Sequence, residues 1–451
     1  MADGSGTPPG WRLAAAALLG GGFACGVAAT GGGRLGRAVT GLAVLVATGM
    51  TVPLARASRR PPIPPSPAGL APPEPSLTFS IVVAARDEAA VLPRLVADVA
   101  AQDHRDASGA PCFELLVVDD RSTDGTGAAA VEAAERAGIA AVTRVVRREG
   151  DGLADGKGAA LTAAQPDACR GDVVLVLDGD ARIGPDFLRR AAAYFMAGAA
   201  AVTARRRIMD AGSSQLAAAQ ADEQTLDGEL QRGRWALGGC SEFRGDGIMV
   251  RRDLLAAVGG WRAAALTEDI DLSSRIAAAR GERVAWAIDA EVWEEPVRSW
   301  GSLWHQRRRW AEGALRRAFE HGPAVLRSDA LPLGARLDFA AYAGQLAVPP
   351  LVLGAAAGAA AGRRRGPLLG LLTGYLLASG ILGYDALRWE TAAGVPPRPA
   401  ARLGRALRVS LFSAIWLAAL PRAAWDLAVG SGRIRYVKME HNGGDPSETR
   451  P

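Results

Sequence analysis

The stretch "DVVLVLDGD" at residues 172–180 decides the fold. Its five consecutive apolar residues, 173–177, are typical of a strand that is buried on both faces of a parallel sheet. Asp178 and Asp180 follow the apolar run directly. Similar short apolar runs recur along the middle of the chain: "LTFSIVVAA" at 77–85, "FELLVV" at 113–118, "VTRVV" at 142–146 and "AAVTARR" at 200–206.

Alanine-rich segments separate these apolar runs, and we expect helices at 89–101 and 127–137. Strands that alternate with helices predict an α/β doubly wound domain. Ligands of such domains bind at the carboxyl ends of the strands. No GxGxxG follows the first run and no GxxxxGKS occurs, which disfavours a dinucleotide-binding fold and a P-loop.

Acidic residues gather at these predicted carboxyl ends. In an extended segment Asp178 and Asp180 would point the same way about 7 Å apart and could share a hard divalent cation, Mg²⁺ or Mn²⁺. Such an ion usually takes phosphate oxygens as well, which makes a nucleotide diphosphate the natural partner. A plain polar turn is the alternative. A haloacid-dehalogenase nucleophile fits poorly, because Arg182 stands where that pattern needs Thr.

Two further motifs suit the same ligand. Asp119 and Asp120 in "DDRSTDGT" could accept hydrogen bonds from a base or ribose, or they could simply begin a turn and a helix cap. Lys157, between glycines in "DGKGAAL", suits a diphosphate, although a lone lysine is commonly a solvated surface charge. Lys157 and Lys438 are the chain's two lysines among 52 basic residues, which suggests a need for a compact ammonium.

The segment "LTEDIDLSSR" predicts a helix start with Thr267 as N-cap. Glu268, Asp269 and Asp271 then lie in the first turn, where the helix dipole favours negative charge. The functional alternative is a general base that takes a proton from an acceptor hydroxyl. Spacing alone leaves both interpretations open.

The ends of the chain indicate a membrane protein. Hydrophobic residues make up 49% of the 451 residues, and apolar segments near the length of a bilayer span cluster at both ends. The net charge is only +5 and the arginines form short clusters, so nucleic acid is not an expected partner. Four scattered cysteines without a CxxC pair disfavour a disulfide framework and a zinc site.

We expect four or five membrane spans. Segments 13–30 and 38–55 are typical of a helical hairpin, and the arginines and prolines that follow predict a stiff linker on the cytoplasmic side. The C-terminal segments are 339–361, 368–387 and 407–429. The last of them contains Pro421, Arg422 and Asp426, so it either spans the membrane or is re-entrant or interfacial.

The stretch "SLWHQRRRWAEGAL" at 302–315 combines features of a ligand-binding site with features of a membrane-surface helix. On a helix Gln306, Arg309 and Trp310 fall at i, i+3 and i+4, one face that can look into a cleft. Arg307 and Arg308 point elsewhere and, with Trp300 and Trp304, suit a membrane-surface helix.

Seven motifs in order resemble those of the family 2 inverting glycosyltransferases, in particular membrane-embedded members such as cellulose, chitin and hyaluronan synthases. They are "SIVVAARDE", "LLVVDDRSTDGT", "GKGAAL", "LVLDGD", "FRGDGIMVRRDLLAAVGGW", "LTEDIDLSSR" and "QRRRW". The resemblance covers about residues 76–310. One departure is Asp87, where the family often has Asn before Glu.

The resemblance implies a GT-A domain that binds a nucleotide-diphosphate sugar with Mg²⁺ or Mn²⁺. It implies these residue roles: nucleotide-sugar binding by Ala84, Arg86, Glu88, Asp119, Asp120, Lys157 and Asp178; metal binding by Asp178 and Asp180; general base catalysis by Asp269; acceptor or diphosphate contacts by Glu268, Gln306, Arg309 and Trp310. Transfer would be direct, without a covalent intermediate, so the anomeric configuration should invert.

The expected function is transfer of a sugar to a glycan acceptor in cell-surface or extracellular polysaccharide synthesis. The alternative acceptor is a membrane lipid or polyprenyl phosphate, and a decayed sugar-nucleotide-binding protein and a nucleotidyltransferase are weaker alternatives. We expect a protein of the plasma membrane with a cytoplasmic catalytic domain. Its expected parts are a transmembrane hairpin at 1–55, a linker at 56–75, the GT-A domain at 76–298, interfacial helices at 299–335, a transmembrane region at 339–430 and a polar tail at 431–451.

Overall fold

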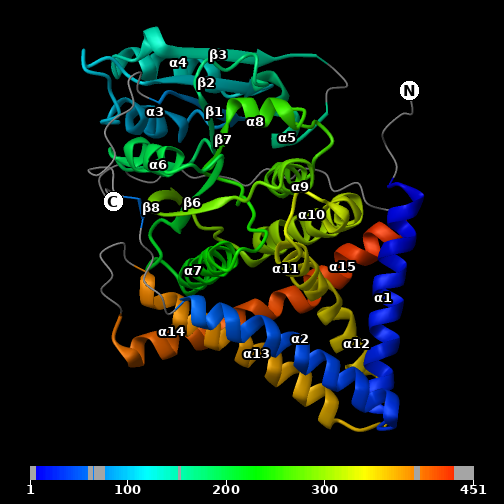
Figure 1. The fold of residues 1–451 in the computed structure, drawn as a ribbon. Helices are drawn as coiled ribbons and strands as arrows, with labels where there is room; N and C mark the ends of the chain where they lie inside the picture. Colours follow the sequence, from blue (N-terminus) through cyan, green and yellow to red (C-terminus); the bar gives the residue numbers. More distant parts are fainter. Residues whose placement is uncertain (1–6, 59–63, 66–76, 151–153, 391–396, 431–451) are drawn as a thin grey trace. The chain divides into compact units, whose positions relative to one another are not determined.

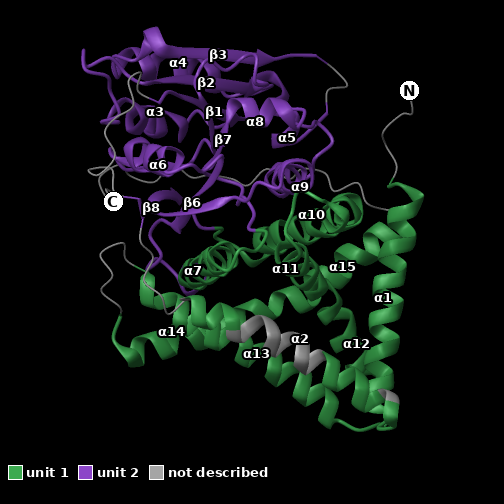
Figure 2. Cartoon of the chain, in the orientation of Figure 1, with its two compact units in different colours: residues 1–61, 218–240, 297–437 green, residues 62–217, 241–296, 438–451 purple. Residues whose placement is uncertain are grey.

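The computed structural model describes residues 7–58, 64–65, 77–150, 154–390 and 397–430. These residues form two compact units (Figure 2). Of the described residues, unit 1 holds 7–58, 218–240, 297–390 and 397–430, and unit 2 holds 64–65, 77–150, 154–217 and 241–296. Residues 218–240 fall inside the range expected for the catalytic domain, and the structure groups them with unit 1.

An eight-stranded sheet forms the centre of unit 2, in the order β3-β2-β1-β4-β7-β6-β8-β5 (Figure 1). The strands are β1 (Phe79–Ala85), β2 (Phe113–Asp120), β3 (Thr143–Arg148), β4 (Val173–Leu177), β5 (Arg182–Ile183), β6 (Ala201–Ile208), β7 (Ile248–Arg251) and β8 (Ala285–Glu294). All five strands expected from the apolar runs are confirmed as β1, β2, β3, β4 and β6.

The sheet is mixed, so the expectation of a parallel sheet holds only in part. Strands β3, β2, β1 and β4 are parallel, as are β6 and β8. Strand β7 lies between β4 and β6 and is antiparallel to both, and β5 is antiparallel to β8. Strand β7 therefore runs opposite to both of its neighbours, and β4 and β6 on either side of it share one direction.

The helices of unit 2 are short and pack on this sheet. They are α3 (Leu92–Ala100), α4 (Thr126–Arg136), α5 (Lys157–Leu161), α6 (Phe187–Met196), α8 (Arg252–Ala257) and α9 (Glu268–Arg280), with 3-10 turns at Ala140–Val142 and Thr162–Ala164. The helices expected at 89–101 and 127–137 are confirmed as α3 and α4. One hydrophobic cluster joins β4 to α9 through Val174, Val176, Leu272 and Ile276, all fully buried. Burying each such side chain contributes about 1.5–3 kcal/mol, which fixes α9 against the sheet.

Unit 1 is helical. It contains α1 (Pro9–Thr30), α2 (Arg34–Ser58), α10 (Trp300–Arg327), α11 (Leu333–Gly344), α12 (Val348–Ala360), α13 (Gly366–Ala386), α14 (Pro399–Phe412), α15 (Trp416–Val429) and most of α7 (Gln215–Ala236), with 3-10 turns at Gln345–Ala347, Leu387–Trp389 and Ser413–Ile415 (Figure 1). Ala15 of α1, Leu315 of α10 and Leu420 of α15 belong to one buried cluster.

Four helical stretches among the described residues are long and apolar enough to cross a membrane: Pro9–Thr30, Leu333–Ala360, Gly366–Trp389 and Pro399–Val429. Helix α2 has 25 residues and forms the second arm of the expected hairpin. The last of the four stretches, Pro399–Val429, has 31 residues and is long enough to cross a membrane in full. Most of the expected linker at 56–75 and the whole tail at 431–451 lie outside the described residues.

Helices α1 and α12 approach closely because glycines face one another. A Cβ atom on Gly26 would lie 2.1 Å from the Leu351 carbonyl oxygen, and one on Gly354 would lie 2.0 Å from the Phe23 carbonyl oxygen. Small residues allow such backbone contact between membrane helices, where packing rather than water exclusion drives association.

Candidate functional site

The acidic turn after β4 begins where the apolar run ends. The Asp178 amide donates to Asp246 Oδ1 at 3.1 Å, and the Ala181 amide donates to the Asp178 carbonyl at 3.1 Å, which closes a turn. The extended geometry assumed for Asp178 and Asp180 is therefore wrong, because the strand ends at Leu177. Asp180 is buried, whereas the Asp178 side chain is 37% exposed.

Gly179, between these two aspartates, lies against Glu88 of the loop after β1. A Cβ atom on Gly179 would stand 1.9 Å from Glu88 Oε2, so only glycine admits this side chain. The approach brings one predicted donor-binding residue, Glu88, to the predicted metal-binding turn.

Lys157, the first residue of α5, joins the two halves of the site. Its ammonium donates to Asp178 Oδ1 and to the Gly245 carbonyl at 2.7 Å, and it lies 3.6 Å from Glu268 Oε1. Burial acts to lower the pKa of Lys157, but the carboxylates of Asp178, Glu268 and Asp246 together outweigh it and raise that pKa. Lys157 is thus a charged side chain among carboxylates and not a solvated surface lysine.

The loop "GDG" at 245–247 supports this arrangement beside β4. Asp246 is fully buried; its Oδ1 accepts from the amides of Asp178 and Gly247, and its Oδ2 has no hydrogen-bond partner among the described residues. Burial and the nearby Asp178 carboxylate raise the pKa of Asp246 well above its usual range. Gly247 has φ 70°, and a Cβ atom there would lie 2.3 Å from Ala204 Cβ, so the position requires glycine.

The start of α9 supplies the predicted base. The helix begins at Glu268, as the N-cap position of Thr267 predicted, although the Thr267 side chain makes no cap hydrogen bond. Asp269 is partly exposed, and its Oδ2 accepts from the Gly245 amide at 2.8 Å. Glu268 is buried, and burial raises its pKa to about 7 although Lys157 acts in the opposite direction.

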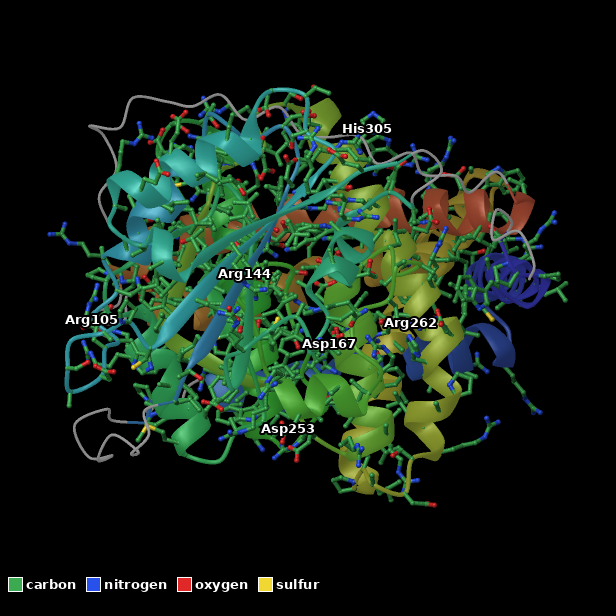
Figure 3. The ribbon with its side chains drawn as sticks, turned by 90° about the horizontal axis from the view of Figure 1, so that it is seen from above. Arg105, Arg144, Asp167, Asp253, Arg262 and His305 are labelled. Carbon is green, nitrogen blue, oxygen red and sulfur yellow. The ribbon has the colours of Figure 1, made fainter. Side chains whose placement is uncertain are left out.

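Asp271, the third acidic residue of the same turn, has a structural role. Its Oδ1 accepts from Arg262 and its Oδ2 from Arg275, both at 2.9 Å. Arg262 is labelled in Figure 3. These contacts hold the first turn of α9 to the preceding loop, so Asp269 alone of the three acids combines exposure with a fixed orientation.

Asp119 and Asp120 at the end of β2 are both buried and both paired with arginines of β3. Arg147 donates to Asp119 Oδ2 at 2.9 Å, and Arg148 donates to Asp120 Oδ1 at 2.8 Å. Arg121 also donates to Asp120 Oδ1, at 3.0 Å. The two carboxylates are therefore held rigidly at the same sheet edge as Asp178.

The loop after β1 is fastened to the loop after β2. Asp87 has φ 50°, a left-handed conformation that Asn and Asp tolerate best, and its Oδ1 accepts from the Thr123 amide at 2.7 Å. The Asp87 amide donates to Ser122 Oγ at 2.9 Å. The amide oxygen of an Asn side chain could accept the same hydrogen bond, so the contact does not require a carboxylate.

Unit 1 carries the "QRRRW" residues on α10. Trp310 stacks on Trp416 of α15, with ring centroids 6.5 Å apart and an interplanar angle of 18°. The Arg307 guanidinium lies 4.3 Å from the centre of the Trp310 ring and donates to Glu223 of α7, whose other oxygen accepts from the Trp416 indole at 3.0 Å. Arg307 therefore fixes the position of Trp310.

The expectation that Arg307 and Arg308 face a membrane surface is wrong. Arg307 is 1% exposed, because α7 and α15 cover that face of α10. Arg308 donates to Asp426 of α15 at 2.6 Å. Trp300, 64% exposed, does fit an interface.

Ten of the predicted residues lie in unit 2, at or just after the carboxyl ends of β1, β2 and β4 and at the starts of α5 and α9: Ala84, Arg86, Glu88, Asp119, Asp120, Lys157, Asp178, Asp180, Glu268 and Asp269. Gln306, Arg309 and Trp310 lie in unit 1. Gly245 and Asp246 were not predicted as site residues, although an aspartate between two glycines immediately before a strand was a usable signal.

The fold is that of a GT-A glycosyltransferase domain. Residues 75–313 match the family described as "Glycosyltransferase like family 2". The chain therefore belongs to glycosyltransferase family 2, and it is a glycosyltransferase with apolar helices flanking the domain.

Among its relatives are two beta-monoglucosyldiacylglycerol synthases. That of Nostoc sp. is 30% identical over 386 residues, which cover 82% of this chain and 77% of the relative. That of Synechocystis sp. is 31% identical over 370 residues, 80% of this chain and 74% of the relative. The fold is similar to that of the mannosyltransferase PcManGT from Pyrobaculum calidifontis, solved in complex with GDP-Man and Mn²⁺, with a TM-score of 0.56, 20% identity, and coverage of 87% of this chain and 99% of that chain.

Proposed function

We propose that this chain transfers a single sugar from a nucleotide-diphosphate sugar to the hydroxyl group of a membrane lipid, with inversion at the anomeric carbon. The observation that carries the lipid acceptor is the extent of the likeness to the Nostoc synthase. An alignment of 386 residues cannot fit within residues 75–313, so it also takes in the flanking helices. This favours the alternative acceptor, a membrane lipid, over the polysaccharide acceptor.

The carboxylates after β4 suit a divalent cation. Asp178 and Asp180 lie on one turn, only a glycine separates them, and carboxylate oxygens are the ligands that Mg²⁺ and Mn²⁺ prefer. These two residues would hold the ion, which would offset negative charge on the diphosphate of the donor. The residues of the loops after β1 and β2 would hold the nucleoside and diphosphate beside it.

Asp269 is the proposed general base. Its Oδ2 accepts a hydrogen bond from the Gly245 amide, and the side chain is partly exposed, so the other oxygen can meet an acceptor hydroxyl. Asp269 takes the hydroxyl proton while the hydroxyl oxygen forms a bond to the anomeric carbon. The bond from that carbon to the donor phosphate breaks, and the nucleoside diphosphate leaves with the electron pair.

Lys157, with Glu268 3.6 Å from its ammonium, positions the proposed metal-binding turn and the proposed base. The Lys157 ammonium holds Asp178 and the Gly245 carbonyl, and Gly245 in turn holds Asp269. The proposed metal-binding turn and the proposed base are thus connected through one lysine and one peptide unit. On the resemblance, Gln306, Arg309 and Trp310 would contact the acceptor or the diphosphate.

The test is a transfer assay with purified protein, a panel of labelled nucleotide sugars, and diacylglycerol in mixed micelles with Mg²⁺ or Mn²⁺. Label in a small organic-extractable product supports the proposal. Label in a water-soluble polymer supports the polysaccharide alternative and overturns the proposal. Asp269→Asn should lower the transfer rate by at least about 10²-fold and leave donor binding intact. Asp253→Asn, an exposed aspartate in the first turn of α8, is the matched control and should transfer at the wild-type rate.

A further inference from the structure

Five exposed arginines gather at one end of the helical bundle of unit 1. Arg34 and Arg37 begin α2, and Arg363, Arg364 and Arg365 connect α12 to α13. We call these five residues the arginine patch. The loop between α1 and α2 and the loop between α12 and α13 lie side by side (Figure 1).

The two loops are joined by hydrogen bonds. The Arg364 amide donates to the Thr30 carbonyl at 3.3 Å, and Arg363 Nη1 donates to the Val27 carbonyl at 3.3 Å. Gly32 has φ 77°, and a Cβ atom there would lie 2.7 Å from the Arg364 guanidinium carbon. The two loops that carry the arginines are therefore held together, although like charges repel.

No carboxylate of the described residues neutralises this charge. The sequence has no Asp or Glu from residue 4 to 58 or from 339 to 384. Within the part of the chain that the structure describes, no carboxylate forms an ion pair with any residue of the arginine patch. Among the described residues the arginine patch has no counter-charge, so an anion can pair with it.

The arginine patch begins where exposed apolar helix surfaces end. Leu42 of α2 is 62% exposed and Leu369 of α13 is 61% exposed, and both lie within about two turns of the arginines. Arginines immediately beyond an apolar span sit at the depth of lipid head groups. Guanidinium groups pair with phosphate through two parallel hydrogen bonds, which ammonium groups cannot do.

We propose that the arginine patch binds the phosphate groups of anionic phospholipids in the leaflet that it faces. This inference concerns the membrane surface of unit 1 and does not depend on the proposed acceptor. One basic residue at an anionic membrane surface gives about a fivefold preference. The five arginines together should therefore gather anionic lipid around this end of the bundle.

The experiment compares full-length proteins reconstituted in nanodiscs of phosphatidylcholine with a minor share of phosphatidylglycerol. Native mass spectrometry after release from the nanodisc counts each lipid retained on the protein. Wild type should retain phosphatidylglycerol above its share of the bilayer. Arg34→Gln, Arg37→Gln, Arg363→Gln, Arg364→Gln and Arg365→Gln combined should reduce this enrichment at least about fivefold.

Three controls give every outcome a meaning. The five corresponding Arg→Lys changes should keep part of the enrichment, since charge remains but the paired hydrogen bonds do not. Arg298→Gln with Arg327→Gln, exposed arginines outside the patch, should retain wild-type enrichment. Inorganic phosphate in excess should not displace the lipid; displacement would point to a site for free phosphate and overturn the proposal. Changing one loop at a time serves if the variant with all five changes does not fold.

The remaining possibility is that these arginines only set the orientation of the bundle. Gly33→Cys, in a Cys25→Ala background, reports the side of the membrane through a membrane-impermeant maleimide, because the other three cysteines are buried and a Cβ on Gly33 meets nothing within 4 Å. Unchanged enrichment in the glutamine variant, with or without an altered labelling side, would overturn the proposal.

Discussion

Replacing Lys157 by arginine should impair the protein even though the charge is kept. The ammonium has three N–H groups in a tetrahedral arrangement and faces three oxygens, from Asp178, Gly245 and Glu268. A guanidinium is planar and larger, so it cannot serve three oxygens that surround one nitrogen. The side chain is only 13% exposed, which leaves little room for rearrangement.

The magnitude follows from the hydrogen bonds that each substitution would break. One hydrogen bond to a charged group is worth about 1.5–3 kcal/mol, so Lys157→Arg should lower the free energy of unfolding by about 2 kcal/mol. Lys157→Met removes the charge from beside the buried Glu268 and should cost about 3–5 kcal/mol. Since Gly245 also orients Asp269, we expect the transfer rate to fall about 10- to 100-fold for Lys157→Arg and about 10²- to 10³-fold for Lys157→Met.

The assay pairs thermal unfolding in detergent with the initial rate of sugar transfer. Arg170→Lys is the control, a cation exchange at a side chain that is 78% exposed, and should change neither quantity. If Lys157→Arg transferred sugar at the wild-type rate and unfolded at the wild-type temperature, the reasoning from ammonium geometry would be refuted.

Three other predictions concern single positions. Gly179→Ala should displace Glu88, with which its Cβ would collide, and lower the transfer rate with a loss of about 1–3 kcal/mol in stability; a wild-type rate would show that this approach is unimportant. Gly26→Ala should destabilise the α1–α12 contact in thermal unfolding, whereas Gly20→Ala on the same helix, where a Cβ meets nothing within 4 Å, should not; equal effects would contradict the close packing. The pKa of Glu268 is raised from 4.5 to about 7 in the folded protein. Between these pH values the folded protein therefore keeps a proton that the unfolded chain has lost. The free energy of unfolding should fall by at most about 3 kcal/mol as the pH rises through this window. Glu268→Gln should flatten that pH dependence, and an unchanged slope would refute the assignment.

The parallel half of the sheet could be predicted because its strands are continuous apolar runs. β1, β2 and β4 are buried on both faces, and the sequence shows this as near-continuous hydrophobicity. β7 and β8 were not anticipated. The segment "IMVR" (248–251) is too short to be distinguished from part of a helix. The segment "AWAIDAEVWE" (285–294) contains acidic residues, and the face of the sheet to which they point depends on the neighbouring strand. Strand direction is a tertiary property that apolar runs do not encode.

The candidate site, like the sheet, could be predicted from the sequence only in part. The order of the motifs led to the prediction of Asp178, Asp180 and Asp269 as site residues, and helix periodicity predicted that Gln306 and Trp310 share one face. Periodicity could not say what covers the next face, so the burial of Arg307 was missed: its partner Glu223 lies 84 residues earlier. The Gly-Asp-Gly sequence was a signal for Asp246, but it does not show that this carboxylate is buried beside Asp178.

The ties between α10 and α15 limit how this enzyme can be shortened. Arg307 and Trp310 meet Trp416, and Arg308 meets Asp426, so the motif helix and the last apolar helix form one packed pair. A fragment that stops before α14 would expose Leu315 and leave two arginines of α10 without their α15 partners. A piece that ends before α10 would lack the tryptophan motif altogether, and it would leave Glu223 of α7 without its partners Arg307 and Trp416.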